Sequence, residues 1–310
     1  MRGLITVFGG SGFLGRYVVR DLLAAGWRVR VASRTPSDGL FLKPQGGLGQ
    51  LQFVAADLTQ PASVARAVAG VDGVINLVGS FARMDAVQHL GAATVAQAAA
   101  QANVKMFVHI SAIGADPGSI SRYGRSKGQG EAAARTAFPS AVILRPSIIF
   151  GREDQFINRF ARMIRSAPIV PVVRPATRFQ PIFAGDVARA ITAALAPKYA
   201  GQLFELGGTQ IMNMSEILSW IGQQIGVHPL YAPVPDLLVA LAARISGWLP
   251  GAPITWDQWL MLQHDTIVSP EARPLNALGI AATPLDVVAE GWLSIYRKHG
   301  RFSPPLAQGA

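Results

Sequence analysis

The first 146 residues alternate between short apolar runs and longer segments with helical hydrophobic spacing. Short apolar runs bounded by glycine, proline or polar residues are typical of buried strands, whereas the longer periodic segments predict helices. Strands are expected at Leu4–Phe8, Arg28–Ala32, Leu51–Ala55, Gly73–Leu77, Met106–Ile110 and Ala141–Leu144. Helices are expected at Phe13–Ala25, Pro61–Val68, Met84–Ala102 and Ser126–Ala137.

This alternation predicts an α/β fold with a doubly wound parallel (Rossmann) sheet, covered by helices on both faces. The ligand of such a sheet lies beyond the carboxyl ends of its strands. After Pro146 the pattern changes, because proline and arginine accumulate. Helices return at Asp186–Leu195 and Ser215–Ile225, and a tail rich in proline and tryptophan begins at Leu230. We expect a dinucleotide-binding domain at 1–146 and a smaller C-terminal lobe at 147–310, with segments that return to the Rossmann domain.

The composition narrows the chemistry that is available. Half of the 310 residues are hydrophobic, which is too many for a disordered chain. The absence of cysteine excludes disulfides, thiolate metal sites and cysteine nucleophiles, and the five histidines have no ligand spacing, so no metal site is expected. No window reaches the roughly 18 to 20 apolar residues that span a bilayer. The N-terminus runs into a strand without a leader pattern, which predicts a cytoplasmic protein.

A glycine-rich turn follows the first predicted strand and precedes the first predicted helix. Glycines at 9, 12 and 15 allow a tight turn, a close approach to a pyrophosphate and tight packing of helix on strand. The helix N-terminus then presents unpaired N–H groups to the phosphates. The residues expected to bind the cofactor here are Gly9, Ser11, Gly12, Phe13, Leu14, Gly15 and Arg16.

The end of the second predicted strand bears on the choice between the two nicotinamide dinucleotides. A protein that selects NAD(H) normally places a carboxylate here for the ribose 2′-hydroxyl. This chain has Ser33 and Arg34, with Arg16 just after the third glycine, and guanidinium groups suit a 2′-phosphate. We therefore expect NADP(H) in preference to NAD(H); the alternative is that Arg34 is simply a solvent-facing loop residue.

Further cofactor contacts are expected where the next strands end. Asp57 and Leu58 follow the third strand and are placed to meet the adenine. Asn76, Val78 and Gly79 follow the fourth strand and are placed near the phosphates and the nicotinamide ribose.

A serine, a tyrosine and a lysine form the candidate catalytic set. Ser111 closes the fifth predicted strand, and Tyr123 and Lys127 are four residues apart, so that they share one face of a helix. The lysine ammonium can stabilise a phenolate and hold the nicotinamide ribose. The tyrosine can then act as general acid or base on a carbonyl or alcohol oxygen that the serine hydroxyl orients.

With these motifs together, the sequence resembles the extended short-chain dehydrogenase/reductase superfamily. It is most similar to the branch that contains the NADPH-binding accessory subunit of respiratory complex I and its bacterial relatives. The stretches that carry this resemblance are 74–79, 109–116, 145–154, 179–188 and 255–265. The family motifs carry over to Gly9, Gly12, Gly15, Arg34, Asp57, Asn76, Ser111, Tyr123, Lys127 and Pro146, and Ile148 beside Pro146 completes the expected cofactor contacts.

The resemblance leaves two functions open. The first is an accessory component of respiratory complex I or the quinone machinery, in which NADP(H) is structural and the protein lies peripherally on the cytoplasmic face of the inner membrane. The second is an active NADPH-dependent reductase, dehydrogenase or epimerase that uses Ser111, Tyr123 and Lys127, with a quinone precursor as one candidate substrate. One departure from the branch is Asp265-Thr266-Ile267-Val268, where Asp-Asn-Val-Val is common, and this puts detail at a docking surface in doubt.

Two segments are candidates for docking onto a protein or an anionic membrane. The net charge is +10, from 28 basic and 18 acidic residues. A predicted helix at 155–165 places Arg159, Arg162 and Arg165 on one side and apolar residues on the other. An apolar stripe runs through Leu237, Leu238, Leu241, Ile245, Trp248 and Leu249. Core packing is the alternative for both segments. Nucleic-acid binding is not expected, because no basic–aromatic reader motif accompanies the charge.

Overall fold

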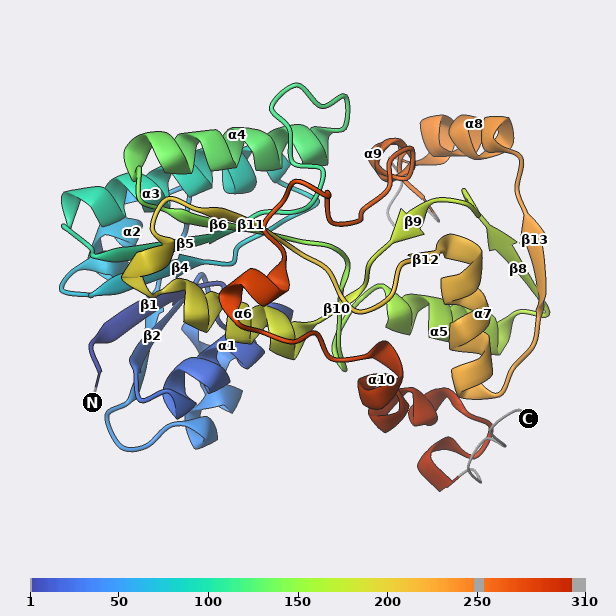
Figure 1. Ribbon diagram of the computed structural model, residues 1–310, viewed down its shortest axis with the longest axis horizontal. Coiled ribbons are helices and arrows are strands. Elements are labelled where there is room, and N and C mark those ends of the chain that lie inside the picture. The colour runs from blue at the N-terminus through green and yellow to red at the C-terminus, as the bar shows by residue number, and fades with distance from the viewer. Residues whose placement is uncertain (1, 248–253, 303–310) are drawn as a thin grey trace. The chain divides into compact units, whose positions relative to one another are not determined.

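A parallel sheet in Rossmann order organises the first part of the protein. The computed structural model describes residues 2–247 and 254–302 (Figure 1). The sheet has the order β11-β6-β5-β4-β1-β2-β3, and every neighbouring pair is parallel. Its strands are β1 (Leu4–Phe8), β2 (Arg28–Ser33), β3 (Leu51–Ala55), β4 (Gly73–Asn76), β5 (Met106–Ile110), β6 (Val142–Pro146) and β11 (Leu203–Leu206). The expected α/β doubly wound parallel sheet is confirmed.

Helices cover both faces of this sheet, as Figure 1 shows. α1 (Phe13–Ala24) and α6 (Ala184–Ala194) pack together on one face, and α2 (Pro61–Val68), α3 (Leu90–Gln101) and α4 (Arg122–Ala137) cover the other. The remaining helical segments here are η1 (Pro36–Gln45), the π-helix η2 (Asp85–His89), η3 (Pro197–Tyr199) and η4 (Leu275–Leu278). Because helices cover both faces, the central strands are mostly apolar, and every residue of β1 is buried.

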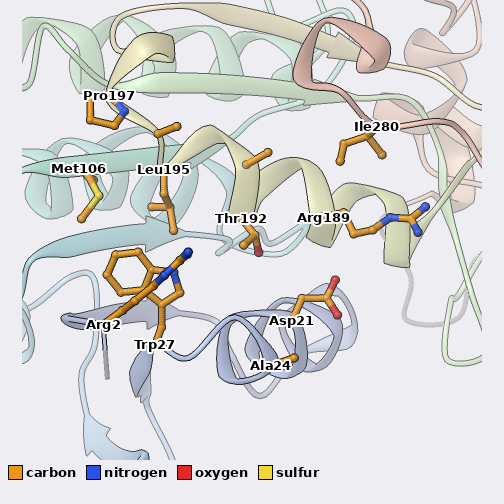
Figure 2. A pocket seen from close by; sticks show the side chains of 12 residues that line it. Arg2, Asp21, Ala24, Trp27, Met106, Arg189, Thr192, Leu195, Pro197 and Ile280 are labelled. Carbon is orange, nitrogen blue, oxygen red and sulfur yellow. The ribbon is translucent and has the colours of Figure 1, made fainter.

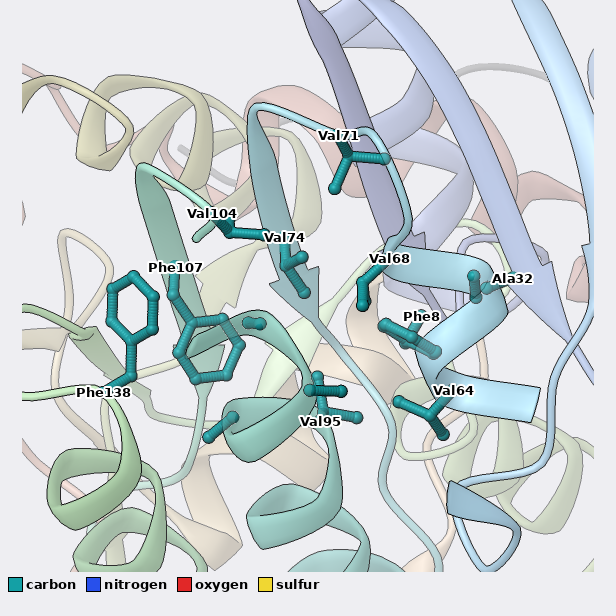
Figure 3. Packing of buried hydrophobic residues seen from close by; sticks show 14 of the residues in the cluster. Phe8, Ala32, Val64, Val68, Val71, Val74, Val95, Val104, Phe107 and Phe138 are labelled. Atoms are coloured by element: carbon teal, nitrogen blue, oxygen red, sulfur yellow. The ribbon is translucent and has the colours of Figure 1, made fainter. Parts of the chain in front are cut away.

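A continuous hydrophobic core lies between the sheet and the α2–α3–α4 layer (Figure 3). Phe8 and Phe107 contribute from the sheet, and Val64 and Val95 from the helices. Phe107 meets Phe138 edge-to-face, with ring centroids 5.5 Å apart. Burying each of these large side chains is worth about 1.5–3 kcal/mol, so this packing holds the strands and their carboxyl ends in place. The site described below is built on those strand ends.

Contacts divide the chain into two units. The first comprises Met1–Pro146, Ala184–Leu206 and Val268–Ala281, and the second comprises Ser147–Phe183, Gly207–Ile267 and Ala282–Ala310. Two stretches that follow Pro146 in sequence thus belong to the unit of the Rossmann sheet; α6 and β11 lie on the first of them and η4 on the second. The division into one domain at 1–146 and a second lobe at 147–310 stays a prediction.

The second unit has its own core, built on α5 (Ile157–Ser166), α7 (Met214–Ile225) and α10 (Leu285–Leu293). Its strands are β7 (Ile149–Phe150), β8 (Ile169–Val172), β9 (Arg178–Phe179), β10 (Ile182–Phe183), β12 (Met212–Asn213) and β13 (Leu230–Pro233). They pair as β7–β10, β8–β13 and β9–β12. α8 (Asp236–Ser246), α9 (Trp256–Met261), η5 (Ser294–Tyr296) and η6 (Gly300–Phe302) complete this unit.

The two docking candidates differ in how they are covered. On α5, Ile157, Ala161 and Ile164 are buried in the second core, and the arginines 159, 162 and 165 are exposed. On α8, Leu237, Leu238, Leu241 and Ile245 are all more than half exposed. Trp248 and Leu249 of the same stripe lie outside the described residues. Across residues 2–247 and 254–302, no helix has the length and apolar character needed to cross a bilayer.

Candidate functional site

The phosphate loop joins the end of β1 to the start of α1. Gly9 has a φ of +79°, a left-handed conformation that favours glycine, and its N–H donates to Ala32 O on β2. The Gly12 N–H closes the turn by donating to Gly9 O at 3.0 Å. Gly12 is also the N-cap of α1, and no side chain caps that helix end. The helix N–H groups therefore suit the anionic pyrophosphate that the sequence predicts here.

Gly15 permits the close approach of α1 to this loop. A Cβ atom at residue 15 would lie 2.3 Å from Gly9 O and 2.5 Å from Gly10 C, and these are backbone atoms with little room to move. We expect Gly15→Ala to lower the free energy of unfolding by about 1–3 kcal/mol through overpacking. Chemical denaturation measures this loss. Gly291→Ala is the matched control, because Gly291 lies exposed in α10 with open space around its Cβ; there alanine should stabilise the protein by up to about 1 kcal/mol.

The end of β2 carries the residues expected to contact a 2′-phosphate. Ser33 is the last residue of β2, its hydroxyl donates to Thr35 O at 3.0 Å, and Arg34 is exposed just beyond it. The Arg16 guanidinium lies over the ring of Phe41 in η1, 4.9 Å from the centroid. The structure thus adds an aromatic support for Arg16 that the sequence did not reveal.

The residues after β3 divide between a surface turn and the core. Asp57 Oδ1 accepts from the Thr59 N–H at 2.8 Å and from its hydroxyl at 2.7 Å. These two bonds, then the charges of Arg83 and Arg34, hold the pKa of Asp57 below its ordinary value. Leu58 is buried in the core and packs under Gly91. The charges of Arg34 and Asp57 therefore attract one another at the expected adenosine end of the site.

Asn76, at the end of β4, is directed into the protein and shapes the loop that follows. Its Oδ1 accepts from the Val78 N–H at 3.2 Å, so its Nδ2 is the donor toward His109 Nδ1, also at 3.2 Å. Burial and, secondarily, the charge of Lys127 lower the pKa of His109 to about 3. His109 is therefore neutral, with its proton on Nε2. A Cβ at Gly79, in the same loop, would lie 3.8 Å from Lys127 Nζ, so this loop passes beside the lysine.

The structure places Ser111, Tyr123 and Lys127 on neighbouring elements, with the lysine against the end of β5. Ser111 is buried just beyond β5, and its hydroxyl has no hydrogen-bond partner among the described residues. α4 begins at Arg122, four residues before the predicted start, because Ser121 caps it through a bond to the Gly124 N–H. Tyr123 is therefore in the first turn and Lys127 one turn further on. Lys127 Nζ donates to Ile110 O at 3.1 Å.

Burial has opposite consequences for the two titratable groups. It raises the pKa of Tyr123 to about 12, and the ring of Phe81 stacks on the tyrosine at 4.9 Å. Burial lowers the pKa of Lys127 to about 8, against an opposing effect of Glu131. At neutral pH the phenol carries its proton and the ammonium is largely protonated. The set is thus arranged to donate a proton to a developing oxyanion.

The last two expected cofactor contacts, Pro146 and Ile148, lie at the end of β6 and just beyond it. Pro146 ends β6, is buried, and accepts from the Ile113 N–H at 3.1 Å. Ile148 belongs to the second unit, where its carbonyl accepts from Ile182 N and its side chain packs on that unit's core.

Sequence reasoning missed the ion pairs behind Lys127. Arg145 of β6 forms a bidentate pair with Glu131 of α4, at 2.8 and 2.7 Å, and its third nitrogen lies 3.6 Å from Glu205 on β11. A signal was present, because Arg145 is a charged residue in an otherwise apolar strand. Only the folded structure shows that the two glutamates are its partners.

A separate cavity of about 720 Å³ lies near the amino-terminal ends of the strands, opposite the phosphate loop (Figure 2). Arg2, Trp27 and Met106 line it at or just before the starts of β1, β2 and β5, and α6 contributes Arg189 and Thr192. It is therefore not the phosphate site, which lies where the strands end. Within the described part of the chain, no cluster of three histidine or acidic residues could hold a metal ion.

A parallel sheet in this order, with a glycine loop after its first strand, defines a Rossmann protein of the nicotinamide-dinucleotide class. Residues 5–207 match the model of the NAD dependent epimerase/dehydratase family, and the chain belongs to this family. The resemblance to extended short-chain dehydrogenases/reductases is thereby confirmed.

Relatives and solved structures agree with this assignment. The chain is 33% identical over 305 residues to the mitochondrial NADH dehydrogenase [ubiquinone] 1 alpha subcomplex subunit 9 of Mus musculus, covering 95% of this chain and 80% of that protein. It is 29% identical over 255 residues to the ceramide reductase of Caulobacter vibrioides, covering 80% and 78%. The triphenylmethane reductase of Citrobacter sp., complexed with NADP(H), superposes with a TM-score of 0.75 at 21% identity, over 93% of this chain and 99% of that one, which supports the fold.

Proposed function

We propose that this chain is an NADP(H)-binding accessory protein of respiratory complex I or the quinone machinery. The observation that carries the proposal is the 33% identity, over almost the whole chain, to the alpha subcomplex subunit 9 of mouse NADH dehydrogenase [ubiquinone]. In this role the nucleotide holds the first unit together. A ligand present at a thousandfold excess over its Kd stabilises a fold by roughly 4 kcal/mol.

Isolation from native membranes tests the proposal. The protein is tagged at its C-terminus, membranes are solubilised in mild detergent, and a native gel is stained for complex I activity. We expect the tagged protein to migrate with that activity and to release NADPH when it is denatured. A protein that migrates alone in every preparation contradicts the proposal.

We propose NADP(H) rather than NAD(H) as the nucleotide, on the support of Ser33, Arg34 and the stacked Arg16. Charge-assisted hydrogen bonds to a phosphate contribute about 1.5–3 kcal/mol. Arg34→Ala should therefore weaken NADPH binding by about 10- to 100-fold and leave NADH binding nearly unchanged, as calorimetric titration can measure. Exposed Arg162 on α5 provides the control, and Arg162→Ala should alter neither affinity. An equal loss for both nucleotides in Arg34→Ala would mean that this residue does not read the 2′-phosphate.

A second function, an active NADPH-dependent reductase, is favoured by the intact Ser111, Tyr123 and Lys127 and by the similarity to a ceramide reductase. Bound NADPH supplies the hydride. Ser111 would position the carbonyl oxygen through its hydroxyl, for which the described residues offer no partner, and Tyr123 would donate the proton that this oxygen takes up. Lys127 stabilises the resulting phenolate. The quinone machinery makes a quinone precursor one substrate to assay.

We also propose that the apolar face of α8 contacts an anionic membrane and that the protein lies peripherally on the cytoplasmic side. Four exposed aliphatic side chains and the neighbouring Trp256 and Trp259, whose rings are in contact, support this, because such faces insert into the interface between headgroups and acyl chains. Vesicles with and without anionic lipid measure it by flotation. Leu238→Glu should reduce binding to anionic vesicles, whereas Val287→Glu, at an exposed position of α10, is the control. Equal binding by both variants contradicts the contact.

A further inference from the structure

The buried ion pairs behind Lys127 form one connected network across α4, β6 and β11. Arg145 binds both carboxylate oxygens of Glu131 and approaches Glu205 from its other side. Glu205 Oε2 in turn accepts from the Ser269 N–H at 2.9 Å, in the segment that returns to the first unit. Glu131 and Glu205 are 5% and 7% exposed, so neither carboxylate has water as its main partner.

Lys127 belongs to this network through Glu131. The two residues are four apart on α4 and therefore lie on the same face, one turn from each other. Lys127 is 4% exposed, and the hydrogen-bond partner found for its Nζ among the described residues is a neutral carbonyl, Ile110 O. Lys127 and Arg145 carry two positive charges and Glu131 and Glu205 two negative ones. The cluster is neutral only while the lysine keeps its proton.

Other ionisable groups around Lys127 do not compensate for Glu131. On β5, His109 is neutral, and on α4, Tyr123 carries its proton. Helix α3, which packs along α4, has no charged residue. In η2, Asp85 is paired with His89 at 3.0 Å. Asp116, beside α4, is exposed and accepts from the Gly118 N–H. Glu131 is thus the buried carboxylate available to the ammonium among these neighbours.

We propose that Glu131, fixed by Arg145, is the positioning residue that keeps Lys127 protonated and directed toward the nucleotide site. This inference rests on the proposed binding of NADP(H) at that site. The bidentate geometry matters because it holds the carboxylate in one rotamer, whereas a single bond would let it turn away. β11, as the outermost strand, contributes through Glu205, which holds Arg145 from its other side.

Titration of Lys127 in the nucleotide-free protein tests the proposal. In protein labelled with ¹⁵N-lysine, the Nζ signal of Lys127 is assigned by comparison with Lys127→Arg and followed by NMR against pH. The wild-type midpoint is expected at about 8. Because Glu131 favours the charged lysine, Glu131→Gln should move the midpoint down by about one pH unit. Binding of NADPH, measured by fluorescence, should begin to weaken at a correspondingly lower pH.

Glu205→Gln is the matched control, since Glu205 has similar burial and the same arginine partner but lies across the arginine from α4. It should leave the Lys127 midpoint within a few tenths of a unit of wild type. A Glu131→Gln midpoint that coincides with wild type, or an equal shift in Glu205→Gln, would overturn the proposal.

A second variant keeps the test informative if Glu131→Gln does not fold. Glu131→Gln/Arg145→Gln removes both charges of the pair, and because Glu131 is the partner that acts on the lysine, the midpoint should still fall. An unchanged midpoint in the double variant also overturns the proposal. Wild-type protein that binds no NADPH at any pH refutes the proposed function instead, and the NMR titration separates the two results.

Discussion

Replacing Arg145 by methionine is expected to lower the free energy of unfolding by about 3 kcal/mol. Methionine is apolar and close to arginine in volume, so most of the loss comes from the charges rather than from a cavity. Glu131 and Glu205 would both stay buried without a counter-charge, and breaking a buried pair from one side costs about 3–5 kcal/mol. The lower end applies because the Arg145 side chain is itself 23% exposed. Equilibrium denaturation by urea, followed by circular dichroism, measures the change.

Two variants make this result interpretable. Arg145→Lys keeps one positive charge but cannot reproduce the bidentate geometry, so its loss should be intermediate. Arg162→Met removes an exposed arginine from α5 and should change stability by less than about 0.5 kcal/mol. If Arg145→Met were as stable as wild type, the two glutamates would have to find other partners, and the ion-pair network would not be a stabilising element.

The sheet was predictable wherever local sequence decides the structure. β3 and β5 span the predicted residues, and β1 does so too because its run is mostly apolar and a sharp glycine turn ends it. α4 was different, since its first turn contains arginine, tyrosine and glycine and lacks a hydrophobic period. The signal at that end is Ser121, whose hydroxyl accepts from Gly124 N. Capping, not periodicity, sets this helix start.

β11 was not predicted, because its pairing is not local. Leu203–Leu206 is a run of four residues with a glutamate inside it, and alone it resembles a loop as much as a strand. It becomes a strand by parallel pairing with β6, where Leu203 lies opposite Ile143 and Glu205 opposite Arg145. The register that makes the strand therefore also makes the ion pair. Neither can be derived without knowing which of the segments after Pro146 returns to the sheet.

The candidate site shows the same limit. Glycine spacing and the Tyr-Lys interval identify Gly9, Gly15, Tyr123 and Lys127, because the chemistry needs those residue types at fixed separations along the chain. The groups that adjust them are distant in sequence. Phe81 reaches Tyr123 by stacking, and Arg145 reaches the helix of Lys127 from a strand. Motifs thus predict the reacting groups, whereas their electrostatic environment requires the fold.

Tyr123→Phe is expected to lower any NADPH-dependent reductase activity of this protein by about 10²- to 10⁴-fold, the range for loss of a general acid. The phenol is protonated up to a pKa of about 12, so the wild-type rate should not fall because of Tyr123 within the usual pH range. It should fall as the pH rises through about 8, where Lys127 loses its proton and the phenolate loses its stabilising charge. Steady-state rates between pH 6 and 10 measure both effects.

The same substitution separates the two proposed functions. Phenylalanine keeps the ring that stacks on Phe81, so NADPH affinity and the melting temperature should stay close to wild type. Tyr199→Phe, which removes the exposed hydrogen bond that its hydroxyl donates from η3 to Ala277 O of η4 at 3.4 Å, is the control for loss of a tyrosine hydroxyl alone. A large fall confined to Tyr123→Phe establishes proton donation by this residue. Turnover that persists in Tyr123→Phe rejects the mechanism. If the wild-type protein holds NADPH but reduces no carbonyl substrate, the nucleotide has a structural role. The glycine loop and the buried lysine then serve to bind it.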